Sequence, residues 1–278
     1  METKVSSLKK EVVISHDQPT VLIGERINPT GKKKLAAALQ ASDLKLICQK
    51  ALAQVEAGAD ILDINVGLSE VDEVILLPLA VQAVMDTVDV PLCLDSTNPK
   101  ALEAALKTYR GKPIVNSVSG AEHSLEEVLP LVKEYGAAVI GLTMDDEGIP
   151  SDQERRVTIA HKIVERAEVV GIPRHDVIID CLAMTVGADS RAGLVVIEAI
   201  RRVKAELGVN LTLGASNISF GLPDRNLINS TFLSIAIAAG VNCPIVDVGK
   251  VRPTILAADL IMGRDNYAKR YIKSYRQR

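Results

Sequence analysis

Aromatic side chains are scarce in this sequence. It contains no tryptophan, two phenylalanines and five tyrosines among its 278 residues. A core built around large aromatic rings is therefore excluded, and aliphatic residues must fill the interior. The hydrophobic fraction of 47% is sufficient for a large core of that kind. Branched aliphatic residues are typical of parallel strands that are buried on both faces.

Charge of one sign is also lacking, because the formal net charge is only −3 at pH 7. So weak a charge argues against bulk attraction to nucleic acid or to an anionic membrane. No stretch is apolar for the roughly 20 residues that a membrane-spanning helix requires. Met1 to Lys4 lead into no long apolar run, so we expect no signal peptide and no membrane contact. The basic segment 269–276 is predicted to be a solvated terminal helix.

Cysteine is the third residue type in short supply. The four cysteines form no Cys-x-x-Cys pair and have no regular spacing: Cys48, Cys93, Cys181 and Cys243. We expect them to be reduced, buried thiols of a cytoplasmic protein. Cys181 follows Asp180 directly, but a packed core thiol is favoured there over a nucleophile.

What is present is an alternation of short apolar runs with amphipathic helical segments. The runs are residues 21–27, 61–67, 91–97, 113–119, 137–144, 177–183, 211–217 and 243–248. Eight such units without a break in composition predict one α/β domain over residues 1–278, a (β/α)8 TIM barrel. Residues 1–20 precede the barrel as an extension that covers its bottom or stays loose. A doubly wound open sheet is the alternative, disfavoured because no glycine-rich dinucleotide fingerprint follows the first run.

The helical segments carry start and stop signals. Start signals are Ser42, Asn98 before Pro99, Ser124 with Glu127, and Ser151 with Glu154. Glycines stand where helices are expected to end: Gly136, Gly171, Gly208 and Gly240.

The candidate site residues are the polar residues at the ends of the runs, because TIM-barrel active sites lie at the carboxyl ends of the strands. They are Glu25, Arg26, Asn28, Asp63, Asn65, Asp95, Ser96, Asn98, Asn116, Ser117, Asp145, Asp146, Asp180, Ser216, Asn217, Ser219, Asp247 and Lys250. Histidine is missing from this set, since His16, His123, His161 and His175 fall in expected loops or helices. We therefore expect no imidazole metal site, and no Ser-His-Asp or Cys-His catalytic set.

A ring of carboxylates and amides is suited to a heterocycle that is recognised by its edges. A carboxylate accepts two neighbouring N–H groups, and an amide both donates and accepts. A pterin has such N–H donors at its amino group and N3, with acceptors at N1, O4 and N5. A purine or flavin edge would fit this ring as well.

Several motifs, in order along the chain, resemble the pterin-binding domain of corrinoid-dependent methyltetrahydrofolate methyltransferases. The run Gly24–Gly31 (GERINPTG) resembles the start of that domain, and Leu213–Gly221 (LGASNISFG) resembles its seventh strand. Shorter matches are Leu62–Asn65, Leu94–Ser96, Val115–Ser117, Ile179–Asp180 and Pro223–Asn229. The resemblance extends from about residue 20 to the end. The same family includes the folate domain of cobalamin-dependent methionine synthase and is related to dihydropteroate synthase.

The resemblance implies a dihydropteroate synthase-like TIM barrel that moves a methyl group between N5 of tetrahydrofolate and the cobalt of a corrinoid. It implies that Asp95, Asn116 and Asp180 hold the pterin, that Asn217 hydrogen-bonds at N5, and that Arg225 orients the folate tail or a closing loop. Catalytic roles are expected of Asn217, Asp95 and Asp180. Further pterin or folate contacts are expected of Gly214, Ser216, Ser219, Glu25, Asn28 and Asp63. Lys250 and Arg252 are expected either to meet the folate glutamate or a partner, or to be solvated.

Departures from the related families narrow the expectation. Dihydropteroate synthase has a lysine at the position of Asn217 and an Arg-x-His after the last strand, where this chain reads Asp247–Arg252 without histidine. The chain has no Asp-x-His-x-x-Gly cobalamin motif and no zinc-binding cysteine cluster. We therefore expect the corrinoid on a separate partner protein, with methyltetrahydrofolate or tetrahydrofolate as substrate. The family also implies a homodimer. Two alternatives remain: a dihydropteroate synthase-like transferase and a non-catalytic folate-binding subunit of a corrinoid complex.

Some candidates have an equally simple structural explanation. Asp63 and Ser96 could cap the helices that follow their strands. The acidic residues Asp145 to Glu147 could bind a cation, but a solvated loop is favoured.

Overall fold

The computed structural model describes residues 1–276. Its main feature is a sheet of eight parallel strands in the order β10-β3-β4-β5-β6-β7-β8-β9. The strands are β3 (Ile23–Ile27), β4 (Ile61–Asn65), β5 (Leu92–Asp95), β6 (Ile114–Ser119), β7 (Ala138–Leu142), β8 (Val177–Asp180), β9 (Asn210–Thr212) and β10 (Ile245–Val246). A parallel bridge between Gly214 and Ile245 joins the two ends of this order. The predicted (β/α)8 barrel is thus confirmed, and the open doubly wound sheet is wrong.

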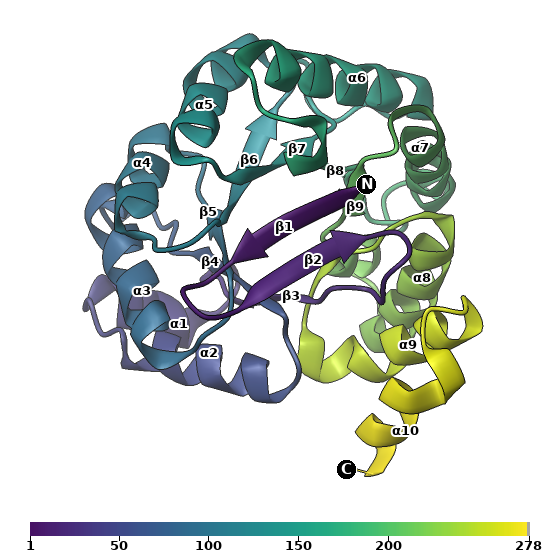
Figure 1. The fold of residues 1–278 in the computed structure, drawn as a ribbon, viewed down its shortest axis with the longest axis horizontal. Helices are drawn as coiled ribbons and strands as arrows, with labels where there is room; N and C mark the ends of the chain where they lie inside the picture. Colours follow the sequence, from purple (N-terminus) through teal and green to yellow (C-terminus); the bar gives the residue numbers. More distant parts are fainter. Residues whose placement is uncertain (277–278) are drawn as a thin grey trace.

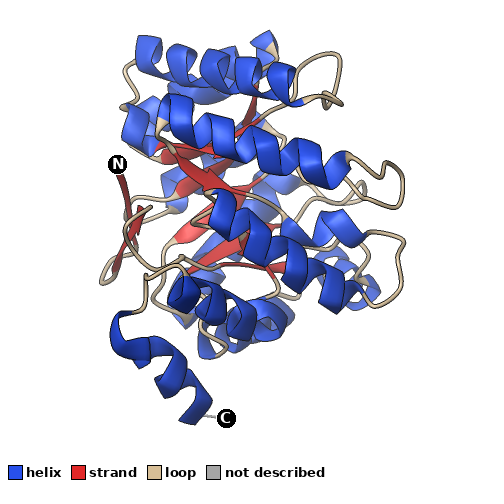
Figure 2. Cartoon of the chain, turned by 90° about the vertical axis from the view of Figure 1, so that its right-hand side faces the viewer, coloured by secondary structure: helices blue, strands red, loops and turns tan. Residues whose placement is uncertain are grey.

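Helices surround the barrel, as Figure 1 shows in a view along it. They are α1 (Lys33–Gln40), α2 (Lys45–Glu56), α3 (Glu73–Thr87), α4 (Pro99–Thr108), α5 (Glu122–Tyr135), α6 (Gln153–Val170), α7 (Ala192–Leu207), α8 (Arg225–Ala239) and α9 (Val248–Ile261). The basic tail forms α10 (Lys269–Arg276), the terminal helix that the sequence predicted, and it extends away from the barrel in Figure 2. No helix within residues 1–276 is long and apolar enough to cross a membrane.

Two aliphatic layers form the core, in keeping with the scarcity of aromatic residues. The larger layer lies between the sheet and the helices and includes Leu62, Leu77 and Ile163. The smaller layer lies within the barrel, where Ile61, Ile140 and other inward-facing residues meet. Side chains thus fill the barrel, as they do in TIM barrels generally, and only the strand ends are open for a site.

The first residues form a hairpin that covers the bottom of the barrel. Strands β1 (Glu2–Ser6) and β2 (Glu11–Ser15) pair in antiparallel register. Their buried side chains Val5, Val12 and Ile14 belong to the inner aliphatic layer. Figures 1 and 2 show the hairpin at one end of the barrel, opposite the long loops at the other end. Of the two alternatives for residues 1–20, coverage of the bottom is therefore the one observed.

The last two strands are shorter than predicted. The run 211–217 leaves the sheet after Thr212, and Ala215–Ser219 forms the 3-10 turn η2. The run 243–248 pairs only at Ile245 and Val246, and α9 begins at Val248. In both places the chain turns at polar residues after the strand and does not continue the strand pairing. The predicted strand ends are therefore wrong where the chain enters the site. Two further 3-10 turns, η1 (Arg174–Asp176) and η3 (Asn266–Ala268), lie outside the barrel sheet.

The predicted helix signals were partly right. Asn98 caps α4, accepting from the Lys100 N–H at 3.0 Å, and the four glycines stand at helix ends. The caps predicted at Ser42, Ser124 and Ser151 are wrong. Ser42 has a φ of 52° and lies before α2, and Ser124 lies within α5. Asp152 caps α6 in place of its neighbour Ser151, because its carboxylate oxygen reaches the Arg155 N–H at 2.9 Å.

Candidate functional site

A pocket of about 520 Å³ opens at the carboxyl ends of the strands. Of the residues to which the resemblance assigns a catalytic, pterin or folate contact, all except Ser219 line it: Glu25, Asn28, Asp63, Asp95, Asn116, Asp180, Gly214, Ser216, Asn217 and Arg225. Ser219 is fully buried behind the wall instead. Pockets of this size and position bind small molecules in many barrels.

The floor of the pocket is a hydrogen-bonded group of two carboxyls and one amide. Asp63, Asp95 and Asn116 come from the neighbouring strands β4, β5 and β6. Asn116 Nδ2 donates to Asp63 Oδ1 at 3.1 Å. Burial, and then the negative charge of Asp95, raise the pKa of Asp63 well above its usual value. Burial raises the pKa of Asp95 to about 6, against opposing hydrogen bonds from Asn65 and Asp63.

Both shifts favour the protonated form of the floor carboxyls. Of the two carboxyls, Asp63 therefore holds its proton more firmly than an exposed aspartate does, because its site is buried and Asp95 lies beside it. A neutral carboxyl can donate a hydrogen bond and an ionised one accepts only. The floor therefore offers both donors and acceptors to a ligand.

Asp180 adds a second acceptor at the end of β8. One of its oxygens accepts the Leu182 N–H at 2.7 Å. Burial raises the pKa of Asp180 to about 6, although the backbone N–H groups of Leu182 and Gly214 oppose the shift. At neutral pH this carboxylate is mostly ionised and can accept two adjacent N–H groups from a ligand.

A buried arginine shapes the loop after Asp180. Arg156 on α6 is 2% exposed. Its Nη1 donates to the carbonyls of Cys181 at 2.7 Å and Leu182 at 2.6 Å, and its Nε donates to Pro150 at 2.9 Å. Leu182 has a φ of 57°, a conformation that costs a leucine free energy. The hydrogen bonds from Arg156 hold this turn and, through it, Asp180.

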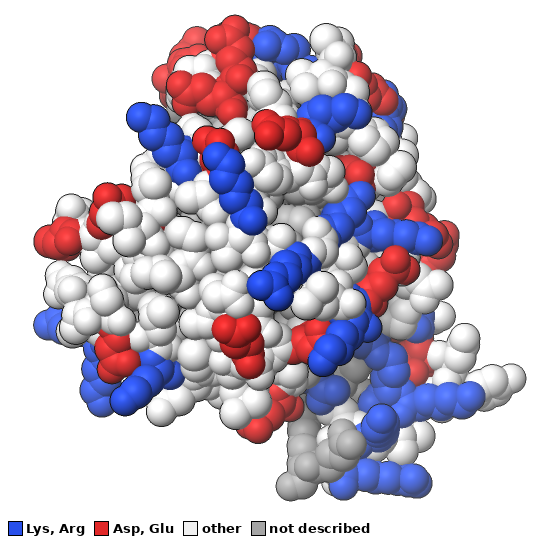
Figure 3. Space-filling model, turned by 60° about the vertical axis from the view of Figure 1, so that its left-hand side comes forward, with Lys and Arg blue, Asp and Glu red and all other residues white. Residues whose placement is uncertain are grey.

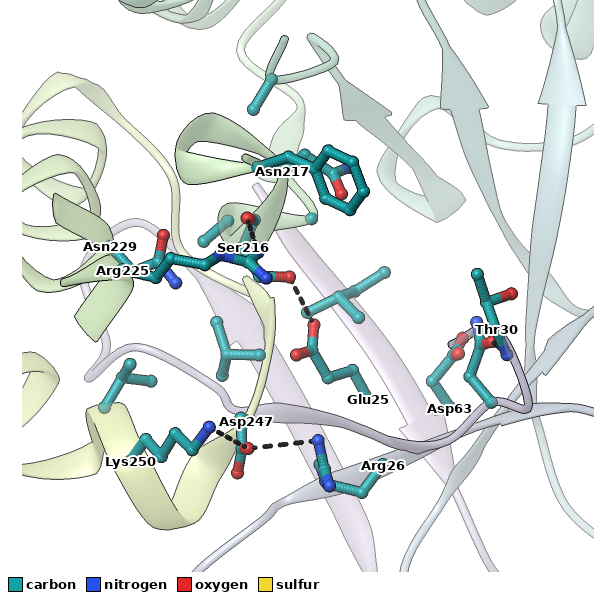
Figure 4. Close-up of a pocket in the computed structure, with 18 of the residues that line it drawn as sticks. Glu25, Arg26, Thr30, Asp63, Ser216, Asn217, Arg225, Asn229, Asp247 and Lys250 are labelled. Carbon is teal, nitrogen blue, oxygen red and sulfur yellow. Dashed lines mark hydrogen bonds and ion pairs between the residues drawn. The ribbon is translucent and has the colours of Figure 1, made fainter. Parts of the chain in front are cut away.

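The upper wall brings the first strand and the η2 turn together, as Figure 4 shows. Ser216 Oγ donates to Glu25 Oε2 at 3.2 Å. Burial raises the pKa of Glu25, and the Ser216 hydrogen bond only partly offsets this effect. Glu25 is thus a further carboxyl of the pocket, and it holds its proton more firmly than an exposed glutamate does.

Asn217 lies on the η2 turn with its amide exposed to the pocket, and the side chain makes no hydrogen bond with the described chain. Arg225, which also lines the pocket, supports this turn. Its Nη2 donates to the Ser216 carbonyl at 2.8 Å, and its Nε donates to Ser219 Oγ at 3.0 Å. The guanidinium also lies 5.6 Å from the centre of the Phe220 ring. Arg225 and Ser219 therefore position the turn that carries Asn217, and Arg225 fits the predicted contact with a loop better than one with a folate tail.

Three charged residues form an ion network at the rim. Asp247 Oδ2 lies 3.4 Å from Arg26 Nη1 and 3.6 Å from Lys250 Nζ, and Figure 4 shows both contacts. Arg252 does not line the pocket, because its Nη1 donates to Ser274 Oγ at 2.9 Å. Asn28 lines the pocket but also closes its own turn, with Oδ1 accepting the Thr30 N–H at 2.9 Å.

Some lining residues were not predicted from the sequence. They are Thr30, Lys32, Phe220, Asn226, Asn229 and four apolar residues of the wall, Leu182, Ala183, Ala215 and Val251, with Ile245 and Val246 of β10. Most lie beyond the last residue of a strand, in loops or at helix starts. Their position in the sequence relative to the strand ends does not identify them as lining residues. The sequence has no other pattern that shows that their side chains point into the pocket.

The remaining candidates have structural partners. Ser96 accepts the Asn98 N–H at 3.0 Å and donates to Glu73 Oε2 at 2.6 Å, in a turn that leads into α4. Asp145 pairs with Arg155 at 2.9 Å in an exposed turn. Within residues 1–276, no group of three or more His, Cys, Asp or Glu side chains is placed to hold a metal ion. Cys181 is buried, as predicted.

Solved structures with the same fold are pterin enzymes by their descriptions. The DHPS of Yersinia pestis, solved with a pterine–sulfa conjugate, superposes with a TM-score of 0.73 at 17% identity, covering 94% of this chain and 99% of that one. The dihydropteroate synthase of Xanthomonas albilineans, in complex with 7,8-dihydropteroate, gives 0.68 at 20% identity, with 90% and 95% covered. At these identities the likeness establishes the fold alone.

Sequence comparison identifies nearer relatives. The chain is 31% identical over 267 residues to the methylcorrinoid:tetrahydrofolate methyltransferase of Eubacterium limosum, covering 92% of this chain and 96% of that protein. It is 34% identical over 265 residues to the methionine synthase of Mycobacterium tuberculosis, covering 91% of this chain and 22% of that protein. The family described as pterin binding enzyme matches residues 24–247. The chain therefore belongs to the pterin-binding enzyme family.

Proposed function

We propose that this protein is a methyltransferase that moves a methyl group between N5 of tetrahydrofolate and the cobalt of a corrinoid carried by a separate protein. The named relative from Eubacterium limosum supports this activity, because it matches along nearly its whole length. The main structural support for this activity is that one pocket is lined by Asp95, Asn116 and Asp180 together with the free amide of Asn217. The domain is proposed to be the whole chain, with the hairpin as part of it.

The floor is suited to the pterin ring. The ionised carboxylate of Asp180 would accept the amino group and N3–H of the pterin side by side. Asp95 and Asn116 would meet the ring from the neighbouring strands, while Asp63 holds Asn116 in place by accepting its Nδ2 hydrogen bond. Because these groups are buried and hydrogen-bonded, they bind the ring without reorganisation.

Asn217 is proposed to meet N5. A tertiary amine is a poor methyl donor, and protonation of N5 makes its nitrogen a better leaving group. An amide can accept from a protonated N5 and donate to an unprotonated one after rotation, so Asn217 would stabilise the charge that changes during transfer. Arg225 and Ser219 hold the turn on which this amide lies.

Glu25 is the group proposed to hold the N5 proton. Its carboxyl lies beside Ser216, the residue before Asn217, and burial raises its pKa. A carboxyl with a raised pKa can act as acid in one direction and as base in the other. When bound, the corrinoid would supply the cobalt that gives or takes the methyl group, and the open mouth of the pocket would admit it.

The test is an anaerobic assay with 5-methyltetrahydrofolate and cob(I)alamin, followed by the visible spectrum of the corrinoid. Formation of methylcobalamin is expected. A parallel calorimetric titration with 6-hydroxymethyl-dihydropterin pyrophosphate tests the dihydropteroate synthase-like alternative. That alternative requires the protein to bind the pyrophosphate more tightly than 5-methyltetrahydrofolate. Folate binding with no turnover, on cobalamin or on a corrinoid protein, would favour a non-catalytic subunit.

A homodimer is also proposed, with an apolar face of α3 as the contact. Ile75 and Leu79 on this helix are 62% and 49% exposed. On the side that bears α3 and α4, Figure 3 shows a broad uncharged area with charges of both signs around it. A helix that is apolar on all sides is usually covered. Light scattering should give twice the chain mass, and Ile75→Glu should halve it.

The four free thiols suit a reducing compartment, so we place the protein in the cytoplasm.

A further inference from the structure

A second hollow adjoins the pocket at the start of α1. It has a volume of about 310 Å³ and is lined by five cationic side chains, which we call the basic groove: Arg26, Lys32, Lys33, Lys34 and Lys50. Leu35 and Leu46 form its apolar surface. Arg26 and Lys32 also line the main pocket, so the two hollows are continuous at the rim.

The position of the lysines is costly for the helix that they begin. Lys33 and Lys34 occupy the first turn of α1 and Lys32 stands at its N-cap, with no acidic residue in that turn. The N-terminus of a helix carries partial positive charge, so cations there destabilise the helix, whereas anions there stabilise it. Three consecutive lysines at this point do not serve the stability of α1.

The groove also has an excess of positive charge. Burial, and then the charge of Arg26, lower the pKa of Lys32 and of Lys50. Asp247 pairs with Arg26 at the rim. Within residues 1–276 no ion pair joins Lys32, Lys33, Lys34 or Lys50 to an acidic side chain. An anionic ligand would remove the mutual repulsion of these side chains.

We propose that the basic groove binds the oligo-γ-glutamyl tail of the folate. This inference rests on the proposed function, which places the pterin at the pocket floor and directs the rest of the molecule outward. Such a tail carries a separate carboxylate on each glutamate, matching cations contributed by the end of β3, the start of α1 and the middle of α2. The half-buried Leu46 would pack against the methylene groups that separate the carboxylates.

The test compares folates that differ only in tail length. Calorimetric titration of the whole protein with 5-methyltetrahydrofolate mono- and pentaglutamate should show about tenfold tighter binding of the pentaglutamate, the order expected of a few exposed ion pairs. This preference should weaken at high salt. In the triple variant Lys33→Gln/Lys34→Gln/Lys50→Gln, the ratio of the two dissociation constants should fall to about twofold or less.

Lys45→Gln is the matched control, because Lys45 is an exposed lysine of α2 that does not line the groove. It should keep the ratio of the unmodified protein, and thermal melts should show that all variants are folded. Equal affinity for the two folates in the unmodified protein would overturn the groove proposal and leave the methyltransferase standing. A preference that survives in the triple variant would also overturn it. Failure of every folate to bind would overturn both proposals.

Discussion

Asn217 has a side-chain amide that is free to meet a ligand, while Ser216 and Ser219 on the same turn are hydrogen-bonded to Glu25 and Arg225. Asn217→Ala should lower the rate of methyl transfer about 10²-fold or more, because a donor aimed at a developing charge is worth several kcal/mol. The dissociation constant for folate should change less. Single-turnover spectroscopy of the corrinoid measures the first quantity, and calorimetry the second.

Asn266→Ala is the control for this change, since Asn266 is exposed and remote from the pocket. It should have the rate of the unmodified protein. A rate for Asn217→Ala within about threefold of that value would remove this amide from the mechanism, whatever the effect on folate affinity.

The carboxyls of the floor predict a pH dependence of folate binding. Asp95 and Asp180 each have a pKa of about 6, and the proposed contacts need their ionised forms. Binding should therefore be full above pH 7 and lost as pH falls through 6. The dissociation constant should rise about tenfold per pH unit for one such group, and more steeply if both take part.

Calorimetry between pH 5 and 8 measures this dependence. Asp180→Asn should bind folate weakly at pH 7.5 and show a shallower slope below pH 6, because only Asp95 still titrates in that range. Glu103→Gln, on the surface of α4 and away from the pocket, should reproduce the unmodified curve. An affinity that is constant from pH 8 to 5 would contradict the roles given to both aspartates.

At the scale of elements, the loop after β8 depends on a buried cation. Arg156→Met should lower the free energy of unfolding by about 3 kcal/mol or more, because the carbonyls of Pro150, Cys181 and Leu182 lose their donor. The same change should weaken folate binding, since the turn that it frees carries Asp180. Urea unfolding and calorimetry give the two values.

Arg166→Met provides the comparison on the same helix. Arg166 forms an exposed ion pair with Glu122, in which the two side chains are 35% and 53% exposed. Its loss should cost no more than about 1 kcal/mol. Equal effects of the two substitutions would show that Arg156 is not a structural support of the loop.

The elements also show how far the sequence could predict the site. Continuous aliphatic runs indicated each barrel strand, because strands buried on both faces have this pattern. The runs overextended at β9 and β10, where apolar and polar residues alternate and tertiary contacts decide where pairing stops. Strand-end position and the motifs predicted Asp95, Asn116, Asp180 and Asn217 as lining residues, and the structure places them there.

Other features of the site depend on contacts between distant segments. The hydrogen bonds from Arg156 to the loop after β8 join residues that are 25 and 26 positions apart. No periodicity or motif in the sequence distinguishes Arg156 from the exposed charged residues of α6. The basic groove was missed for a similar reason: its lysines are plain in the sequence, but only the packing of α1 against α2 brings Lys50 to them.

At the scale of the whole molecule, the barrel has a functional end and a stabilising end. The pocket with its carboxyls of raised pKa lies at the carboxyl ends of the strands. Such buried carboxyls destabilise the fold at neutral pH, because folding makes their ionisation harder. The hairpin and the inner aliphatic layer at the opposite end offset part of this cost. This separation predicts that the two ends respond differently to mutation.

Ile14 tests the stabilising end. It is fully buried where the hairpin meets the barrel interior. Ile14→Ala should lower the free energy of unfolding by about 2 to 5 kcal/mol, since it removes apolar contacts and leaves a cavity. The folate affinity of the folded protein should stay within about twofold of the original, because the pocket lies at the other end of the strands. Leu8 lies between the two strands of the hairpin and is 68% exposed. Leu8→Ala should change the free energy of unfolding by no more than about 0.5 kcal/mol. Urea unfolding with and without folate measures both quantities.

If Ile14→Ala weakened folate binding as strongly as it weakened the fold, the two ends would be mechanically linked through the barrel, and the hairpin would belong to the functional site.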